Sequence, residues 1–227
     1  MSKIHVGGDM DATFDFLSRL SDNNNRPWFK ENKTEYDAIR LHWISQLQRM
    51  IDAMTEWEPA VATVSAASAT YRIYRDTRFS PDKTPYKTHI GASINPPGCT
   101  PHCGYYIEFN PKAGESGLYG GIWCPDSETL KKLRHAIVDN IEEWEEIVSD
   151  PELRKLYPGW CGPALKTIPK GWDKNHPQAE YLRLKSYGKF HPLDRKFFDD
   201  KDWPLRAAEL MRPLKPLVDF LDYSVKE

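Results

Sequence analysis

The sequence predicts an α+β protein, with one antiparallel sheet of four to six strands packed against long N-terminal and central helices. Two observations favour this fold class. Apolar residues recur at helical spacing over residues 27–54 and 126–148, and short alternating segments joined by turn residues follow one another between residues 71 and 123. Because successive strands with short connections pair as an antiparallel meander, a parallel βαβ arrangement is disfavoured.

Three helices are expected before residue 150, a short helix and turn over residues 151–162, and an interrupted helix from Trp203, where Pro213 and Pro216 prevent a straight one. A short helix is predicted over residues 11–20, and the three Asn residues that follow it suit a turn or a cap. Pro27 fits the first turn of the next helix, where its missing N–H is not needed, and the apolar spacing then continues to Met54. The helix over residues 126–148 carries a late acidic run, which we interpret as a solvated face. That run comprises Asp139, Glu142, Glu143, Glu145 and Glu146.

Strands are expected where side chains alternate between apolar and polar. The predicted strands cover residues 71–75, 88–95, 104–110 and 117–123. Residues 181–187 fit either one more strand or a short helix running into one. Residues 76–85 contain Asp, Ser and Pro and are expected to form a loop.

Length and composition limit the class of protein. The chain has 227 residues, of which 40% are hydrophobic and 28% charged, which is ordinary for a globular protein. We see no repeat or linker, so we expect a single α+β domain over residues 1–227. The formal charge of −2 argues against bulk attraction to nucleic acid or to an anionic membrane. No signal peptide or membrane span is recognisable, so we expect a cytoplasmic protein.

Cations alternate with aromatic rings in residues 71–90. This stretch carries five positive and two negative charges, or +3, so the rest of the chain sums to −5. Its cations are Arg72, Arg75, Arg78, Lys83 and Lys87, and its rings are Tyr71, Tyr74, Phe79 and Tyr86. The planar fork of Arg and the compact charge of Lys suit phosphate or carboxylate. The alternative is a structural network in which Arg75 or Arg78 pairs with Asp76 or Asp82.

The candidate site residues follow from this stretch. Arg26 joins them because it begins a helix, where anions are favoured, although a cap and a packed aromatic explain the same residues. The candidate ligand-binding residues are Arg26, Arg72, Tyr74, Arg75, Arg78, Lys83, Tyr86, Lys87 and Lys170. His176 is the candidate for proton transfer, because histidine titrates near neutrality, but a turn histidine is the alternative. Asp76 is the second catalytic candidate, although neighbouring arginines should keep it ionised and weakly basic.

We expect no cofactor and no metal. Cys99, His102 and Cys103 lie close in sequence, but their C-x3-C spacing is not that of a zinc knuckle. Four cysteines in a chain of this size are expected to be reduced thiols. The motifs of P-loop proteins, dinucleotide-binding folds, serine hydrolases and zincins are not found in the sequence. The sequence leaves enzymatic activity open.

Four blocks of the sequence resemble the family called domain of unknown function 2461, whose members occur in bacteria and in some fungi. The blocks are NNNRPWFKENKTEYD (residues 23–37), RIYRDTRFSPDKTPYKTHIG (72–91), GYYIEF (104–109) and IPKGWDKNHPQAEYLRLKS (168–186). They keep their order, and the family-like region covers residues 11–223. The resemblance implies a single α+β domain and implies no activity.

These observations together predict a cytoplasmic protein that binds a small phosphorylated or carboxylated ligand through its Arg/Lys/Tyr-rich segment. One alternative is a module for single-stranded nucleic acid, which cations and stacking rings would hold. Another is a protein-interaction module in which the Arg-rich segment is a structural salt-bridge network. No membrane partner is expected, and the oligomeric state is left open.

Overall fold

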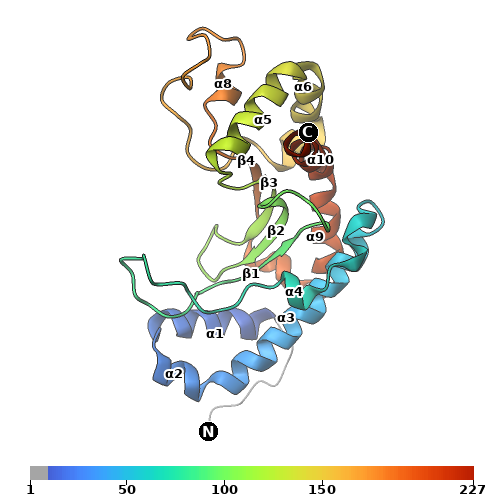
Figure 1. Ribbon diagram of the computed structural model, residues 1–227. Helices are drawn as coiled ribbons and strands as arrows, with labels where there is room; N and C mark the ends of the chain where they lie inside the picture. The colour runs from blue at the N-terminus through green and yellow to red at the C-terminus, as the bar shows by residue number, and fades with distance from the viewer. Residues whose placement is uncertain (1–9) are drawn as a thin grey trace. The chain divides into compact units, whose positions relative to one another are not determined.

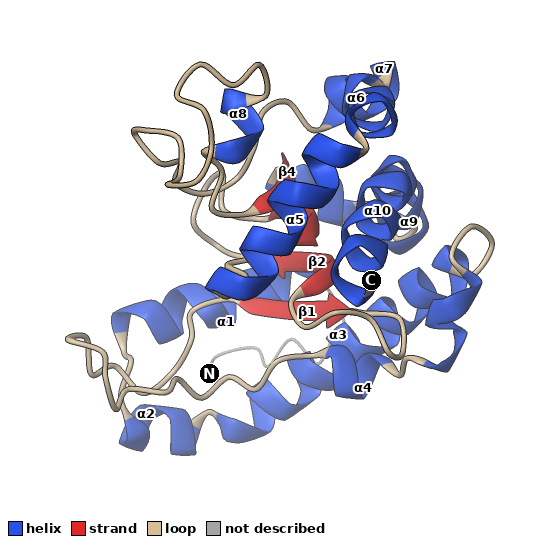
Figure 2. Cartoon of the chain, turned by 45° about the horizontal axis from the view of Figure 1, so that its top comes forward, coloured by secondary structure: helices blue, strands red, loops and turns tan. Residues whose placement is uncertain are grey.

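An antiparallel sheet with the strand order β1-β2-β3-β4 lies among the helices of the computed structural model, which describes residues 10–227 (Figure 1). The strands are β1 (Ile90–Ile94), β2 (Cys103–Phe109), β3 (Gly117–Ile122) and β4 (Tyr187–Pro192). Figure 2 distinguishes these strands from the helices by colour. The α+β class is therefore confirmed, with four strands in the sheet.

The chain forms two compact units. Unit 1 comprises the described part of Met1–Ile94 together with Tyr106–Leu118 and Pro192–Glu209. Unit 2 comprises Asn95–Tyr105, Tyr119–His191 and Leu210–Glu227. The boundaries fall within β2 and β3, so both units contribute residues to these strands. The single domain expected over residues 1–227 stays a prediction.

Unit 1 contains the N-terminal helices, and the helix expected over residues 27–54 is two helices. The α-helices that lie entirely in unit 1 are α1 (Met10–Asp22), α2 (Arg26–Glu31), α3 (Lys33–Met54) and α4 (Ala66–Ala69). Asn32 separates α2 from α3, and its side-chain amide donates to the Trp28 carbonyl at 2.8 Å. Because this bond competes with continuation of the helix, the chain turns there although the apolar spacing continues.

Aromatic side chains form the core of unit 1. Phe14 of α1 lies 4.0 Å from Phe109 of β2, measured between ring centroids. Trp43 of α3 is fully buried and stacks on Trp203 at 6.1 Å. Trp203 begins α9 (Trp203–Met211), and the short 3-10 helices η1 (Pro59–Thr63) and η2 (Arg195–Asp199) complete this unit. These contacts hold the C-terminal part of β2 against α1 and α3.

Unit 2 contains the central helices, and the helix expected over residues 126–148 is also two helices. Its helices are α5 (Ser127–Asp139), α6 (Ile141–Ser149), α7 (Pro151–Leu156), α8 (Ala179–Leu182), η3 (Arg212–Leu214) and α10 (Lys215–Lys226). Asn140 separates α5 from α6, with φ of −121° and ψ of 43°. Within the core, Trp144 of α6 stacks on Trp160 at 5.5 Å and contacts Phe220 of α10 at 5.2 Å.

The strand predictions have mixed outcomes. Three of the predicted segments correspond to β1, β2 and β3, and residues 181–187 are the end of a short helix running into β4. The strand predicted over residues 71–75 is wrong, because only isolated bridges join Thr70 to Ala92 and Tyr74 to Tyr86. Pro81 and Pro85 lie in the opposing part of the segment, and proline cannot donate to a strand ladder.

None of the helices formed by residues 10–227 is both long enough and apolar enough to cross a lipid bilayer.

Candidate functional site

The Arg-rich segment, residues 71–90, is a long loop of unit 1 that returns to β1. Its two arms meet through three backbone hydrogen bonds, from Tyr71 to Gly91, from Arg75 to Pro85 and from Lys87 to Ile73. The N···O distances of these bonds lie between 2.8 and 2.9 Å. The loop therefore has a base, where it joins β1, and a tip between the two arms.

Tyr86 anchors the loop to the N-terminal helices. The side chain of Asn24 donates to the Tyr86 carbonyl at 2.9 Å and accepts from the Tyr86 N–H at 3.1 Å. Phe29 of α2 stacks on the Tyr86 ring, with centroids 4.1 Å apart and an interplanar angle of 18°. Tyr86 is 5% exposed, whereas Tyr74 beside it is 51% exposed. The structure thus gives Tyr86 a packing role and leaves Tyr74 accessible.

The cations at the tip of the loop already have partners within the loop. Arg78 donates to both carboxylate oxygens of Asp76, and the shortest of these contacts is 2.7 Å. Arg75 forms an ion pair with Asp82 and donates to the Thr84 hydroxyl. Lys83 donates to the Thr77 carbonyl at 2.8 Å.

These bonds also determine the ionisation of the two acids. The Arg78 guanidinium lowers the pKa of Asp76, chiefly by hydrogen bonding. The pKa of Asp82 is lowered first by the Thr84 N–H and then by Arg75. Both carboxylates are therefore weak bases. This part of the segment forms the local network that the sequence left open as an alternative.

Arg72 and Lys87, at the base of the loop, are arranged differently. Among residues 10–227, neither side chain forms an ion pair within 4.0 Å. The ammonium of Lys87 lies 4.9 Å from the centroid of the Tyr71 ring. Partial burial lowers the pKa of Lys87, and the nearby charge of Arg72 lowers it further, although Glu108 opposes both effects. Lys87 is therefore a partly desolvated cation that feels the charge of the exposed Arg72 side chain.

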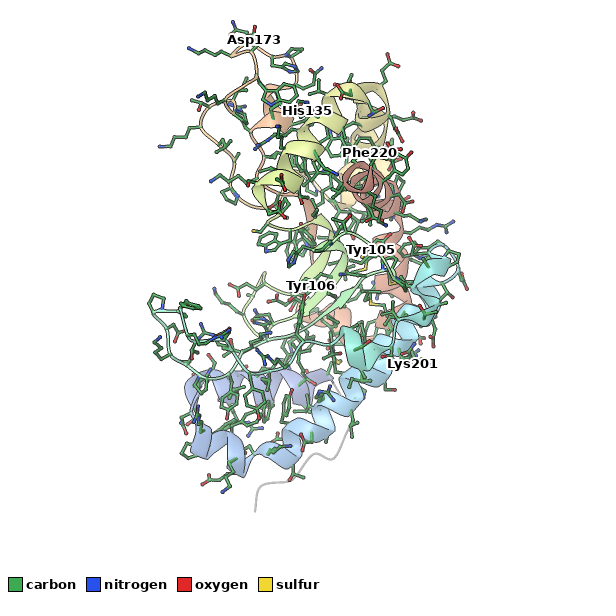
Figure 3. The ribbon with its side chains drawn as sticks, in the orientation of Figure 1. Tyr105, Tyr106, His135, Asp173, Lys201 and Phe220 are labelled. Atoms are coloured by element: carbon green, nitrogen blue, oxygen red, sulfur yellow. The ribbon has the colours of Figure 1, made fainter. Side chains whose placement is uncertain are left out.

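β2 and the residues next to β1 and β2 contribute a second polar group near Lys87. Tyr106 donates from its hydroxyl to Glu108 at 2.7 Å, and Asn110 donates to the other carboxylate oxygen at 2.9 Å. The Nδ1 atom of His89 lies 3.9 Å from Glu108. Tyr106 is labelled in Figure 3, and a Cβ atom at Gly91 of β1 would collide with its ring. Glycine at this position therefore lets the Tyr106 ring lie over β1.

The imidazole of His89 is neutral near pH 7. Burial is the main cause of its lowered pKa, and the cations Lys87 and Arg75 lower it further. The carboxylates Glu108 and Glu115 act in the opposite direction but do not reverse the shift. A neutral imidazole can accept a proton from a bound molecule.

We call the residues Arg72, Lys87, His89, Tyr106 and Glu108 the cationic face. Sequence reasoning found the first two and missed the other three. Tyr106 and Glu108 alternate with buried residues of β2, so the strand pattern placed both on one side. The sequence signal that could have identified these residues is Glu108, a carboxylate within a strand that is otherwise mostly apolar.

The remaining candidates have other surroundings. Arg26 is exposed at the start of α2, and its charge partly offsets the rise in the pKa of Tyr86 caused by burial. Lys170 and His176 belong to unit 2, so the structure describes them separately from the cationic face. His176 accepts a hydrogen bond from the Gln178 N–H at 3.2 Å and packs edge-on against Trp172, as a turn histidine does.

Within residues 10–227, no group of three or more His, Cys, Asp or Glu side chains is placed to hold a metal ion. The pair that invited a metal interpretation is linked differently, because the Cys99 thiol lies 3.4 Å from the Cys103 carbonyl. Burial raises the pKa of both thiols.

The fold and the cationic face define an α+β protein that presents unpaired basic side chains beside a strand. Residues 12–220 match the family described as "Conserved hypothetical protein (DUF2461)", and the chain belongs to this family. No curated protein and no solved structure matches the chain.

Proposed function

We propose that this protein binds a small phosphorylated or carboxylated ligand at the cationic face. The observation that carries the proposal is the pair formed by Arg72 and Lys87. The charge of Arg72 lowers the pKa of the partly buried Lys87 ammonium, and neither cation has an ion-pair partner among residues 10–227. An anion between them would relieve this repulsion and would accept hydrogen bonds from both.

The other cations of the Arg-rich segment have a supporting role in this proposal. Arg75, Arg78 and Lys83 are engaged in bonds within the loop, so they are less available to a ligand. The site that we propose is therefore smaller than the set expected from the sequence, and it is placed at the base of the loop.

His89 is the residue of this face that suits proton transfer. Its imidazole feels the charge of Lys87 and lies 3.9 Å from the Glu108 carboxylate, so a ligand held by Lys87 would lie near it. Asp76 is less suitable, because its bonds to Arg78 hold it in the ionised state. Free thiols at all four cysteines support a reducing, cytoplasmic setting for such a protein.

Calorimetric titration with inorganic phosphate, pyrophosphate and citrate tests the proposal. We expect at least one of these anions to bind, and we expect Arg72→Gln and Lys87→Met to weaken binding about 10- to 100-fold. This range corresponds to the loss of one charge-assisted hydrogen bond, worth about 1.5–3 kcal/mol. The matched controls are Arg78→Gln and Lys83→Met, which remove equal charges from the tip of the same loop.

The controls decide where the anion binds. Control variants that retain binding, together with the loss in the Arg72 and Lys87 variants, would assign the anion to the base of the loop. Equal losses in all four variants would assign it to the whole segment and refute the narrower site. Absence of binding by every anion at millimolar concentration would refute the proposal, provided that circular dichroism shows each variant to be folded.

Exposed rings beside the cations favour a second candidate, a single-stranded nucleic acid. Phe79 is 93% exposed, and Tyr71 and Tyr74 are 49% and 51% exposed. Bases stack on such rings, and the phosphates would bind the cations. A labelled oligothymidylate in the same titration distinguishes the candidates, because a nucleic-acid site would bind it more tightly than phosphate and with a steep dependence on salt.

A further inference from the structure

Unit 2 carries a broad groove that the proposed anion site does not involve. It has a volume of about 1490 Å³, and its walls are helices α5, α6 and α10. Figure 2 shows α5 and α10 side by side, and α10 also packs against α6. Pockets for small molecules usually enclose roughly 300–1,000 Å³. The groove is larger than that range, so its size favours a segment of polypeptide.

The groove is lined by both apolar and acidic residues. Its accessible apolar residues include Pro216 and Tyr223 of α10, with Tyr223 63% exposed, whereas Phe220 is only 7% exposed. Pro216, Phe220 and Tyr223 are spaced by four and three residues, so they share one face of α10. His135 and Phe220, labelled in Figure 3, mark the α5 and α10 sides of the groove.

The walls carry a strong negative charge. Nine Asp and Glu side chains line the groove, against three Lys and Arg side chains, which gives a formal charge of −6. Glu143 and Glu146 of α6 are exposed and form no ion pair within the described part of the chain. The acidic run of α6 is therefore divided, since Glu143 and Glu146 line the groove and Glu142 does not.

We infer that this groove binds a basic amphipathic helix of a partner protein. The apolar side of such a helix would cover Pro216 and Tyr223, as in other helix-in-groove complexes. Its Lys and Arg side chains would face the carboxylates of the walls, and this charge complementarity would speed association and fix the orientation. The inference does not depend on the proposed anion site.

A peptide titration by fluorescence polarisation tests the inference with the full chain. The probe is a labelled helical peptide of about 14 residues, or four turns, with leucine at helical spacing and lysine elsewhere. A peptide of the same composition in scrambled order is its control. We expect the helical peptide to bind in 50 mM salt, and to bind at least tenfold more weakly when salt is raised to 500 mM, because salt screens such contacts.

Variants of the chain locate the peptide. We expect Glu143→Lys combined with Glu146→Lys to weaken binding at least tenfold, and Tyr223→Ala to weaken it about threefold or more. Glu142→Lys combined with Glu145→Lys is the matched control, because it makes the same charge change at positions of α6 outside this groove. The control should change affinity less than twofold. All five residues changed in these variants are exposed, so the fold should persist, as thermal melting will show.

Three outcomes would overturn the inference. The first is binding of the scrambled peptide as tightly as the helical one, since charge alone would then suffice. The second is an equal loss in the control variant, which would show that the groove is not the binding surface. The third is absence of binding in 50 mM salt by the folded wild-type chain.

Discussion

Asn24→Ala should destabilise the protein more than any neighbouring substitution in its run of three asparagines. Asn24 makes two hydrogen bonds to the main chain of Tyr86, which is 5% exposed. A net contribution of about 1 kcal/mol for each bond, with a further cost for leaving buried groups unpaired, predicts a loss of about 2–3 kcal/mol. In a chain of this length the melting temperature should fall by roughly 5–10 °C. Urea unfolding and thermal melting measure both quantities.

Asn23→Ala is the matched control for this prediction. Asn23 makes one side-chain hydrogen bond, to the Arg19 carbonyl at the exposed end of α1. Its loss should cost less than about 1 kcal/mol, because solvent can replace an exposed partner. Equal destabilisation by the two variants would refute the conclusion that Asn24 anchors the Arg-rich segment. Affinity for the anion should also fall in Asn24→Ala, since the anchor holds the arm that carries Lys87.

Two further predictions concern the cationic face. The pKa of His89 is lowered below its ordinary value of 6.5 by burial, Lys87 and Arg75, against Glu108 and Glu115. The unfolded state therefore binds more protons just below pH 6.5, so stability is present above that pH and is lost as pH falls. Urea unfolding between pH 7.5 and 5.5 should show a steeper loss in wild type than in His89→Gln, and equal slopes would contradict the assignment. Gly91→Ala should lower the free energy of unfolding by about 1–3 kcal/mol, because its methyl group would collide with Tyr106. The same substitution in a Tyr106→Ala background should cost clearly less. Equal costs in the two backgrounds would exclude that contact.

Local patterns were sufficient to predict α1, the two long helical regions and three strands, but not the short helices η1 and α4 or where the long helices end. Apolar spacing continues across Asn32 and Asn140, since the residues on both sides face a core. Only the capping behaviour of the two asparagines reveals the breaks. The strand expected over residues 71–75 failed for another reason. Alternation of apolar and polar side chains is a property of a single strand, whereas a hydrogen-bonded strand pair also needs a partner with free N–H groups. Prolines interrupt the opposing arm, so that partner is missing here.

The sequence also indicated which segment is charged, but not which charges remain available. Arg75 and Asp82 are seven residues apart in sequence, and they form an ion pair only because the loop closes. The separation of Lys87 from every acid among residues 10–227 depends equally on how the loop returns to β1. His89, Tyr106 and Glu108 come together across two strands, so their proximity needs the register of the sheet as well as the loop.

The two parts of the Arg-rich segment can be separated by the strength of the contacts that hold them. The ion pairs at the tip are exposed, and exposed pairs contribute about 0–1 kcal/mol each. They cannot by themselves fix the loop against the conformational entropy of ordering it. The part-buried bonds of Asn24 and the stacking of Phe29 on Tyr86 are stronger constraints, and they lie next to Lys87. A binding site gains affinity when its side chains are held in place before the ligand arrives. The base of the loop meets that condition, which is why we place the anion there and not at the more heavily charged tip.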